Sequence, residues 1–172
     1  MYTMKKIKID IPYHPQKMDY LCGPASLQMV FGYFKDTVSQ TKIAKEARTD
    51  AEQGTDNAEM IRVATERGFY VYVNDHSTFY EIRHFLERGL PVIVNYIEPS
   101  HDDGHFAVVS GMTSRKMILH DPWNGKDFKM SYKEFAKRWY GEKNKHREWI
   151  MVVSGEDFKL GKQFIPKVIK SS

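Results

Sequence analysis

The chain carries a single cysteine, Cys22, where a helix is expected to begin. Pro24 fits the first position of a helix, and residues 25–34 repeat apolar side chains at helical spacing. Unpaired backbone N–H groups and the positive end of the helix dipole favour a thiolate there. Gln16, upstream, offers an amide that could donate to a developing oxyanion. Cys22 is therefore the candidate nucleophile; the alternative is a lone buried cysteine acting as a small apolar residue.

Two further residues could activate this thiol, because His105 opens one apolar segment and Asp121 ends the next. Strands over 105–111 and 116–121, joined by a turn of about two to four residues, would form a hairpin. In that hairpin His105 and Asp121 are neighbours or near-neighbours, so the carboxylate can accept from one imidazole nitrogen while the other faces the thiol. A cysteine, a histidine and a carboxylate in this relation form an activated nucleophile.

The remaining histidines offer weaker candidates. His101 lies in the same polar loop as His105 and is the alternative base, but no apolar strand follows it to fix its position. His120 adjoins Asp121 and is expected to point to the opposite face of the sheet. The loop 101–105 also suggests a metal site, yet no further ligand set has metal-ligand spacing. We expect neither a metal nor a cofactor.

The segment Gln-x5-Cys-Gly-Pro-Ala-Ser resembles the nucleophile segment of papain-like cysteine peptidases. It is more similar still to the bacteriocin-processing (double-glycine leader) peptidase family and its free-standing relatives. Residues 104–109 and 120–123 look like that family's histidine strand and the acidic residue after the next strand, so the resemblance spans most of residues 10–125. It implies a papain-like fold and peptide substrates, often cleaved after small residues such as glycine.

The resemblance also assigns roles. It implies Cys22 as nucleophile, His105 as base, Asp121 as the third member and Gln16 as oxyanion donor. Gly23 and Gly104 are expected to shape the substrate-binding cleft, since a glycine lets substrate approach the backbone. Two alternatives stay open: a peptide-binding module of the same fold without turnover, and an acyltransferase that uses the same triad.

The elements that must hold these residues follow from apolar periodicity, capping residues and turns. Strands are expected over 5–11, 69–73, 91–97, 106–111, 117–120 and 149–153. Helices are expected over 23–34, 39–47, 55–68, 78–89 and 131–139. A helical half followed by a mainly antiparallel half gives an α+β fold, with the cleft between the halves.

Length and composition bound the remaining possibilities. With 172 residues, the chain suits one peptidase domain over 1–153 and a basic tail of uncertain order over 154–172. A hydrophobic content of 41% indicates a globular protein, and 28% charged residues argue against a membrane span. The net charge of +4 is scattered, so we expect no nucleic-acid partner. No signal peptide is evident, which favours the cytoplasm, or secretion if a signal was removed. The oligomeric state stays open.

Overall fold

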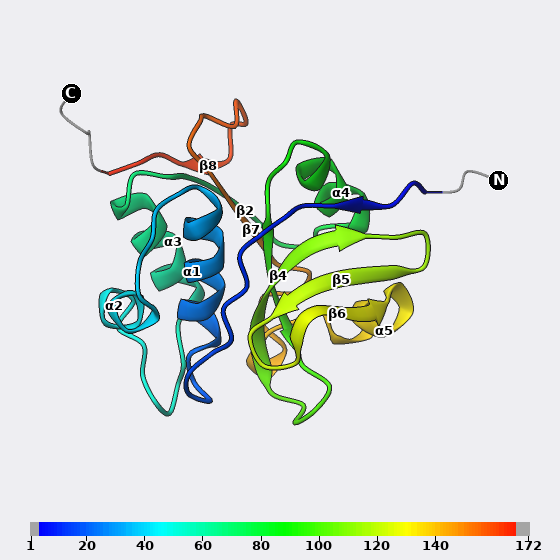
Figure 1. The fold of residues 1–172 in the computed structure, drawn as a ribbon, viewed down its shortest axis with the longest axis horizontal. Helices are drawn as coiled ribbons and strands as arrows, with labels where there is room; N and C mark the ends of the chain where they lie inside the picture. The colour runs from blue at the N-terminus through cyan, green and yellow to red at the C-terminus, as the bar shows by residue number, and fades with distance from the viewer. Residues whose placement is uncertain (1–3, 168–172) are drawn as a thin grey trace.

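A group of helices and an antiparallel sheet make up the protein, whose computed structural model describes residues 4–167 (Figure 1). The first three helices, at one side of the view, are α1 (Cys22–Tyr33), α2 (Gln40–Glu46) and α3 (Asn57–Glu66). Two more, α4 (Phe79–Glu87) and α5 (Tyr132–Arg138), are inserted between strands, and a 3-10 turn spans Glu142–Asn144. This arrangement confirms the predicted α+β, papain-like fold.

Eight strands form one sheet in which every pairing is antiparallel. They are β1 (Ile7–Lys8), β2 (Tyr70–Asn74), β3 (Val92–Ile97), β4 (Gly104–Met112), β5 (Lys116–Asp121), β6 (Gly125–Ser131), β7 (Ile150–Ser154) and β8 (Gln163–Phe164). Their order is β6-β5-β4-β3-β7-β2-β8, and β1 pairs with β4. The sheet therefore places β4 between the two strands whose ends surround the candidate site, β3 and β5.

Local sequence signals place the helix ends close to the expected positions. Ser39, Thr78 and Ser131 each accept a hydrogen bond from the backbone N–H three residues later, as N-caps do. Gly89 follows α4 with φ +75°, a conformation that glycine adopts without a Cβ penalty. The five expected helices are all present, with ends shifted by one to a few residues.

Two strands were not predicted. In β6, lysines and an aspartate interrupt the apolar pattern, because this strand lies at the edge of the sheet and buries little. The two-residue β8 lies within the segment expected to be a tail and pairs with β2. The strand expected over 5–11 is shorter than predicted, with only Ile7–Lys8 assigned to β1.

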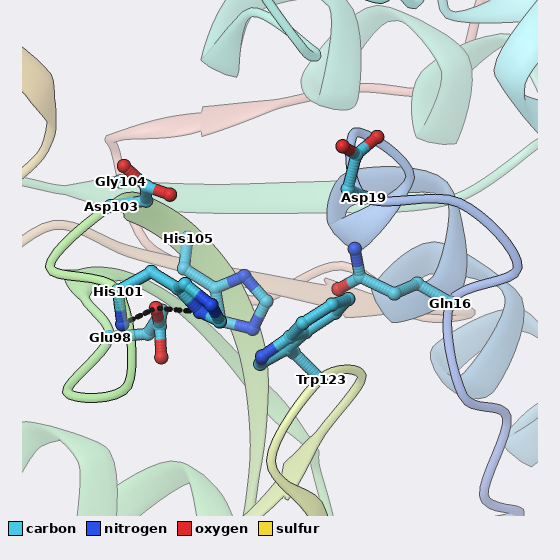
Figure 2. Close-up of a pocket in the computed structure, with 8 residues that line it drawn as sticks. All are labelled: Gln16, Asp19, Glu98, His101, Asp103, Gly104, His105 and Trp123. Atoms are coloured by element: carbon cyan, nitrogen blue, oxygen red, sulfur yellow. Dashed lines mark hydrogen bonds and ion pairs between the residues drawn. The ribbon is translucent and has the colours of Figure 1, made fainter.

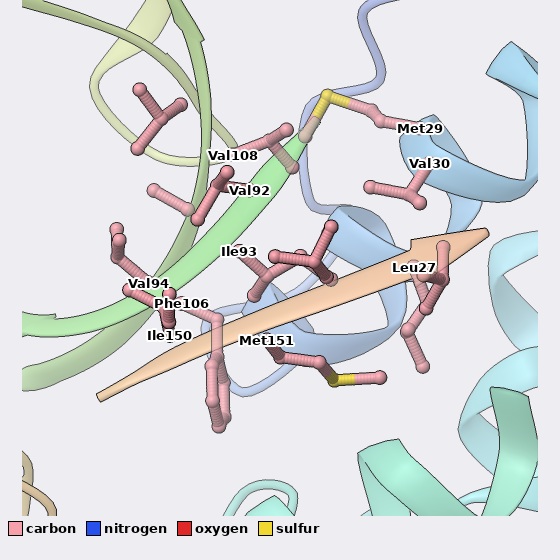
Figure 3. Packing of buried hydrophobic residues seen from close by; sticks show 14 of the residues in the cluster. Leu27, Met29, Val30, Val92, Ile93, Val94, Phe106, Val108, Ile150 and Met151 are labelled. Carbon is pink, nitrogen blue, oxygen red and sulfur yellow. The ribbon is translucent and has the colours of Figure 1, made fainter. Parts of the chain in front are cut away.

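Packing of α1 against the sheet fixes the geometry on which the site depends. Leu27, Met29 and Val30 of α1 are fully buried, and Figure 3 shows them facing side chains of β3, β4 and β7. Fully burying a side chain of this kind stabilises the fold by about 1.5–3 kcal/mol. The start of α1 is thus held rigidly against β4.

The segment after β7 packs onto the outer strands. Phe158 is 3% exposed and lies against the rings of Tyr72 and Phe85, while β8 extends the sheet. Residues 168–172 of the expected basic tail lie outside the described residues. In the described part of the chain, no helix has the length and apolar character needed to cross a membrane.

Candidate active site

Cys22 is the first residue of α1, one residue before the predicted helix start. The N-cap residue, Leu21, has no oxygen in its side chain and makes no cap, and the first turn contains no acidic residue. The donors that a polar N-cap would occupy are therefore left to other groups. Cys22 is a free, partly exposed thiol. The sequence-predicted nucleophile thus lies at the positive end of a 12-residue helix.

His105 and Asp121 are in direct contact. The Nε2 atom of His105 lies 2.8 Å from Oδ1 of Asp121. The β4–β5 ladder pairs Val108 with His120, which brings Asp121 level with Ala107, two residues from His105. The two side chains therefore meet diagonally across the ladder, which confirms that they are near-neighbours.

The Asp121 carboxylate is completely buried, at 0% exposure. Its Oδ1 also accepts from the backbone N–H groups of Trp123 and Asn124, at 2.9 and 2.8 Å. Its Oδ2 accepts a hydrogen bond from the hydroxyl of Tyr96. Burial raises the pKa of Asp121, but the bonds from His105, Asn124 and Tyr96 outweigh it and hold this pKa below its usual range. Asp121 is therefore a stable anion despite its burial.

The His105 ring interacts with the thiol as well as with the carboxylate. Burial disfavours the charged ring, yet hydrogen bonds and charge interactions with Asp121 and Cys22 raise the pKa of His105 to about 10. Because Nε2 faces Asp121, Nδ1 is the nitrogen left for the thiol. The arrangement favours an imidazolium beside the Asp121 anion and can shuttle a proton to and from the sulfur.

Gln16 lies on the other side of the pocket from His105. Its backbone N–H donates to the carbonyl of Pro122 at 3.0 Å, which ties it to the turn after Asp121. Its Nε2 donates to the carbonyl of Met18 at 2.8 Å, while Oε1 is buried without a hydrogen-bond partner among residues 4–167. Figure 2 shows the nitrogen directed toward Asp19 and the oxygen toward the pocket. Gln16 is thus at the site, with one of its two amide N–H donors bonded to Met18.

Gly23 and Gly104 each lie close to another segment of the chain, which the sequence did not indicate. A Cβ on Gly23 would lie 2.9 Å from Cβ and Oγ1 of Thr55, so this glycine lets α1 approach the loop before α3. A Cβ on Gly104 would lie 2.4 Å from Cγ of Glu142. Gly104 borders the pockets at the site, whereas Gly23 is buried and faces protein.

Among the pockets that Gly104 lines within the described range, two include a member of the candidate triad. Figure 2 shows the first, which lies beside the His105 ring. Its lining residues are Gln16, Asp19, Glu98, His101, Asp103, Gly104, His105 and Trp123. The second includes Cys22 and runs between the loop 53–57 and the segment 142–146. Space is therefore available on both sides of the thiol–imidazole pair.

The other histidine candidates are not joined to this pair by any hydrogen bond in the described structure. The side chain of His101 is 58% exposed and contacts Glu98 and Trp123. His120 is buried, lies 3.0 Å from the carbonyl of Ile11 through Nε2, and does point away from His105. Among the described residues, no three His, Cys, Asp or Glu side chains gather as a metal site.

The sequence analysis did not identify Tyr96 and Glu98. Their side chains bind the Asp121 carboxylate and the loops beside the His105–Asp121 pair. The Glu98 carboxylate, 3% exposed, accepts from the backbone N–H groups of Ser100 and His101 and from the amide of Asn124. It thereby joins the loop before His105 to the turn after Asp121. The available signal was the polar side chains of Asn95, Tyr96 and Glu98 at the end of an otherwise apolar segment.

A curated protein is similar to this chain in sequence. The chain is 27% identical over 143 residues to the mesentericin-Y105 transport/processing ATP-binding protein of Leuconostoc mesenteroides, which covers 77% of the chain but 19% of that protein. The chain thus spans about a fifth of the length of this curated relative.

Two solved structures share the fold. The peptidase domain of Streptococcus ComA, a bifunctional ABC transporter of a quorum-sensing pathway, superposes with a TM-score of 0.69 at 23% identity, covering 84% of this chain and 98% of that one. A double glycine motif protease from an AMS/PCAT transporter, solved with a leader peptide, gives 0.68 at 19% identity, covering 87% and 97%.

Solved structures this distant in sequence show the fold alone, whereas a family model assigns the chain to a family. It describes the Peptidase_C39 like family and matches residues 8–146, most of the chain. This range contains Gln16, Cys22, His105 and Asp121, and it confirms the resemblance to bacteriocin-processing peptidases noted from the motifs. The chain therefore belongs to the Peptidase_C39 like family.

Proposed function

We propose that this protein is a cysteine peptidase. The Cys22 sulfur attacks the carbonyl carbon of a peptide bond, and His105 carries the proton that the thiol has given up. The C–N bond then breaks, the amine leaves with that proton, and a thioacyl-enzyme remains. His105 next takes a proton from water, which attacks the thioester and releases the acid and the thiol. Asp121 orients the imidazole and stabilises its charge.

The observation that carries this proposal is the contact of the His105 imidazole with a buried carboxylate, together with the nearby Cys22 thiol that helps to raise the pKa of the ring. His105 lies 2.8 Å from a fully buried carboxylate and interacts with the thiol of Cys22 at the start of α1. A histidine needed only for packing has no reason to sit between a buried anion and a free thiol. Family membership supports the same chemistry.

Gln16 and the backbone N–H of Cys22 are proposed to stabilise the oxyanion. Gln16 is tied to the turn after Asp121 and lines the pocket beside His105. One N–H of its Nε2 is bonded to the Met18 carbonyl, which leaves the second N–H to donate to the oxyanion. A donor of this kind contributes about 10²–10³-fold to turnover.

We propose peptides as substrates, with a double glycine before the scissile bond. The pockets on either side of Gly104 provide room for chain on both sides of that bond. The relative solved with a leader peptide is described as a double glycine motif protease, and the Leuconostoc relative as a transport/processing protein. These descriptions belong to those proteins and suggest the first peptides to try.

Two measurements test the proposal. First, iodoacetamide labelling of Cys22 is followed from about pH 4 to about pH 9 in the wild type, His105→Ala and, as a control histidine, His101→Ala. Labelling that persists well below the free-thiol pKa of ~8.5, and that slows only in His105→Ala, is the expected result. An ordinary thiol curve unaffected by His105→Ala would refute the nucleophile assignment.

Second, double-glycine peptides and matched peptides with alanine in place of both glycines are incubated with the wild type and Cys22→Ser. Mass spectrometry should find cleavage after glycine by the wild type only. Tight binding without cleavage would favour the binding module. Adding a competing amine tests whether the protein is an acyltransferase, because an acyltransferase yields the amide adduct in preference to the free acid.

A further inference from the structure

Tyr96 contacts both members of the His105–Asp121 pair. On β3 it is the cross-strand partner of His105, and the two rings meet edge to face with centroids 5.9 Å apart. Its hydroxyl donates to Oδ2 of Asp121. The residue is 0% exposed and its ring also packs on Phe135. Burial and these contacts therefore fix the position of Tyr96 beside the His105–Asp121 pair.

The hydrogen bonds of Asp121 are divided unequally between its two oxygens. Oδ1 accepts from His105 and from the backbone N–H groups of Trp123 and Asn124. Within residues 4–167, Oδ2 has one donor, the Tyr96 hydroxyl. Water cannot replace it readily, because the carboxylate is fully buried. An unsatisfied buried carboxylate oxygen is costly and favours protonation.

We propose that Tyr96 is a positioning residue that keeps Asp121 ionised and turned toward His105. The inference rests on the proposed function, in which the Asp121 anion orients the imidazole. Tyr96 does not reach the substrate-attacking sulfur; it acts through the carboxylate. The hydroxyl suits this task, since the one acceptor it reaches among the described residues is Oδ2 of Asp121.

The surrounding charges support the assignment. Asp121 faces His105, which in turn lies near Cys22. Glu98 lies near the Tyr96 hydroxyl. The Tyr13 hydroxyl donates to the main-chain carbonyl of Asp121 at 2.8 Å. Burial, then the neighbouring Asp121 anion, raises the pKa of Tyr96, so the hydroxyl keeps its proton and remains a donor at every working pH.

Tyr96→Phe removes this one oxygen and keeps the ring. The direct readout is the titration of the Asp121 carboxyl carbon by ¹³C NMR, which needs no substrate. Loss of a hydrogen bond to a charged group should raise the pKa of Asp121 by about one to two pH units. The acid side of the Cys22 labelling profile should move up with it, because protonated Asp121 no longer holds the imidazolium. A purely structural role would lower the melting temperature and leave both profiles in place.

Tyr13→Phe is the matched control, since it also deletes a tyrosine hydroxyl bonded to Asp121, but at the main chain. Its Asp121 titration should match the wild type. An unchanged titration in Tyr96→Phe, or an equal rise in both variants, overturns the inference. If Tyr96→Phe does not fold, 3-fluorotyrosine at position 96 replaces it: this stronger donor should lower the pKa of Asp121, and no change or a rise overturns the inference.

The readouts separate this inference from the proposed function. If wild-type Cys22 labels as an ordinary thiol while the Asp121 titration rises in Tyr96→Phe, the peptidase mechanism fails and the role of Tyr96 in holding the anion stands. If wild-type labelling shows the thiol–imidazole pair but the Asp121 titration is the same in Tyr96→Phe, only the role of Tyr96 fails.

Discussion

Asp121→Asn tests whether the charge of one buried carboxylate sets the protonation of the thiol–imidazole pair. Asparagine has nearly the same shape and can still accept at Oδ1 from His105 and from the backbone N–H groups of Trp123 and Asn124. The Tyr96 hydroxyl can rotate to accept from the new amide. The substitution therefore removes the charge while keeping most of the contacts.

The structure gives the size of the effect. Although burial lowers it, the pKa of His105 is raised from 6.5 to about 10 by Asp121 and Cys22. A hydrogen bond to a charged group contributes about 1.5–3 kcal/mol, so loss of the Asp121 charge should lower the pKa of His105 by about one to two units. Peptide turnover should fall by about 10²–10⁴, the usual contribution of an oriented acid–base group.

The assay is the titration of ¹⁵N-labelled imidazole in the wild type and in Asp121→Asn, alongside labelling of Cys22 in acid. Asp127→Asn is the matched control, because Asp127 lies 3.6 Å from His120 in the same sheet but is not at the thiol. Asp127→Asn should leave the His105 titration unchanged. A folded Asp121→Asn protein whose His105 still titrates near the wild-type value would refute the reasoning.

Three further predictions concern packing and pH. Gly104→Ala should lower kcat/KM about tenfold, because its Cβ would lie 2.4 Å from Cγ of Glu142 at the edge of both pockets, and Glu142→Ala in the same chain should restore it. Gly23→Ala should reduce the free energy of unfolding by about 1–3 kcal/mol in urea melts, because its Cβ would meet Thr55 at 2.9 Å. Burial lowers the pKa of His120, so the unfolded chain binds the proton more readily; stability should fall as pH drops below about 6.5, and His120→Gln should flatten that slope in melts across this range.

Each of these has an outcome that contradicts it. Failure of Glu142→Ala to rescue the glycine variant would show that the loop carrying Glu142 is not what the new methyl displaces. Unchanged stability of Gly23→Ala would mean that the loop before α3 yields at little cost. If the stability of His120→Gln still falls with pH as in the wild type, groups other than His120 cause the loss of stability in acid.

Several features could be read from local sequence because local physics decides them. Pro24 after the cysteine and the apolar stripe that follows predict the start of α1 to within one residue. Ser39, Thr78 and Ser131 cap helices, since a hydroxyl at such a position satisfies a donor three residues away. The short turn between β4 and β5 predicts that His105 and Asp121 meet.

Other features depended on chain segments that are distant in sequence. A bulge between Val109 and Gly111 shifts the ladder register, so Asp121 lies level with Ala107 instead of Val108 and shares a face of the sheet with His105. The edge strand β6 has no apolar alternation to reveal it, because only one of its residues is buried. The space beside Gly23 is filled by Thr55, more than thirty residues away, which no local pattern indicates.

The sequence by itself determined the candidate nucleophile, its base and its carboxylate, because their residue types and the turns and helix start around them are local properties. Only the tertiary structure decided how each is held. The Tyr96 hydroxyl under Asp121, the Glu98 carboxylate between two loops and the engaged amide of Gln16 are set by strands and loops that meet through packing. The physical reason is that a buried polar group must find its partner in space, and spatial neighbours of this kind leave no periodic signal in the chain.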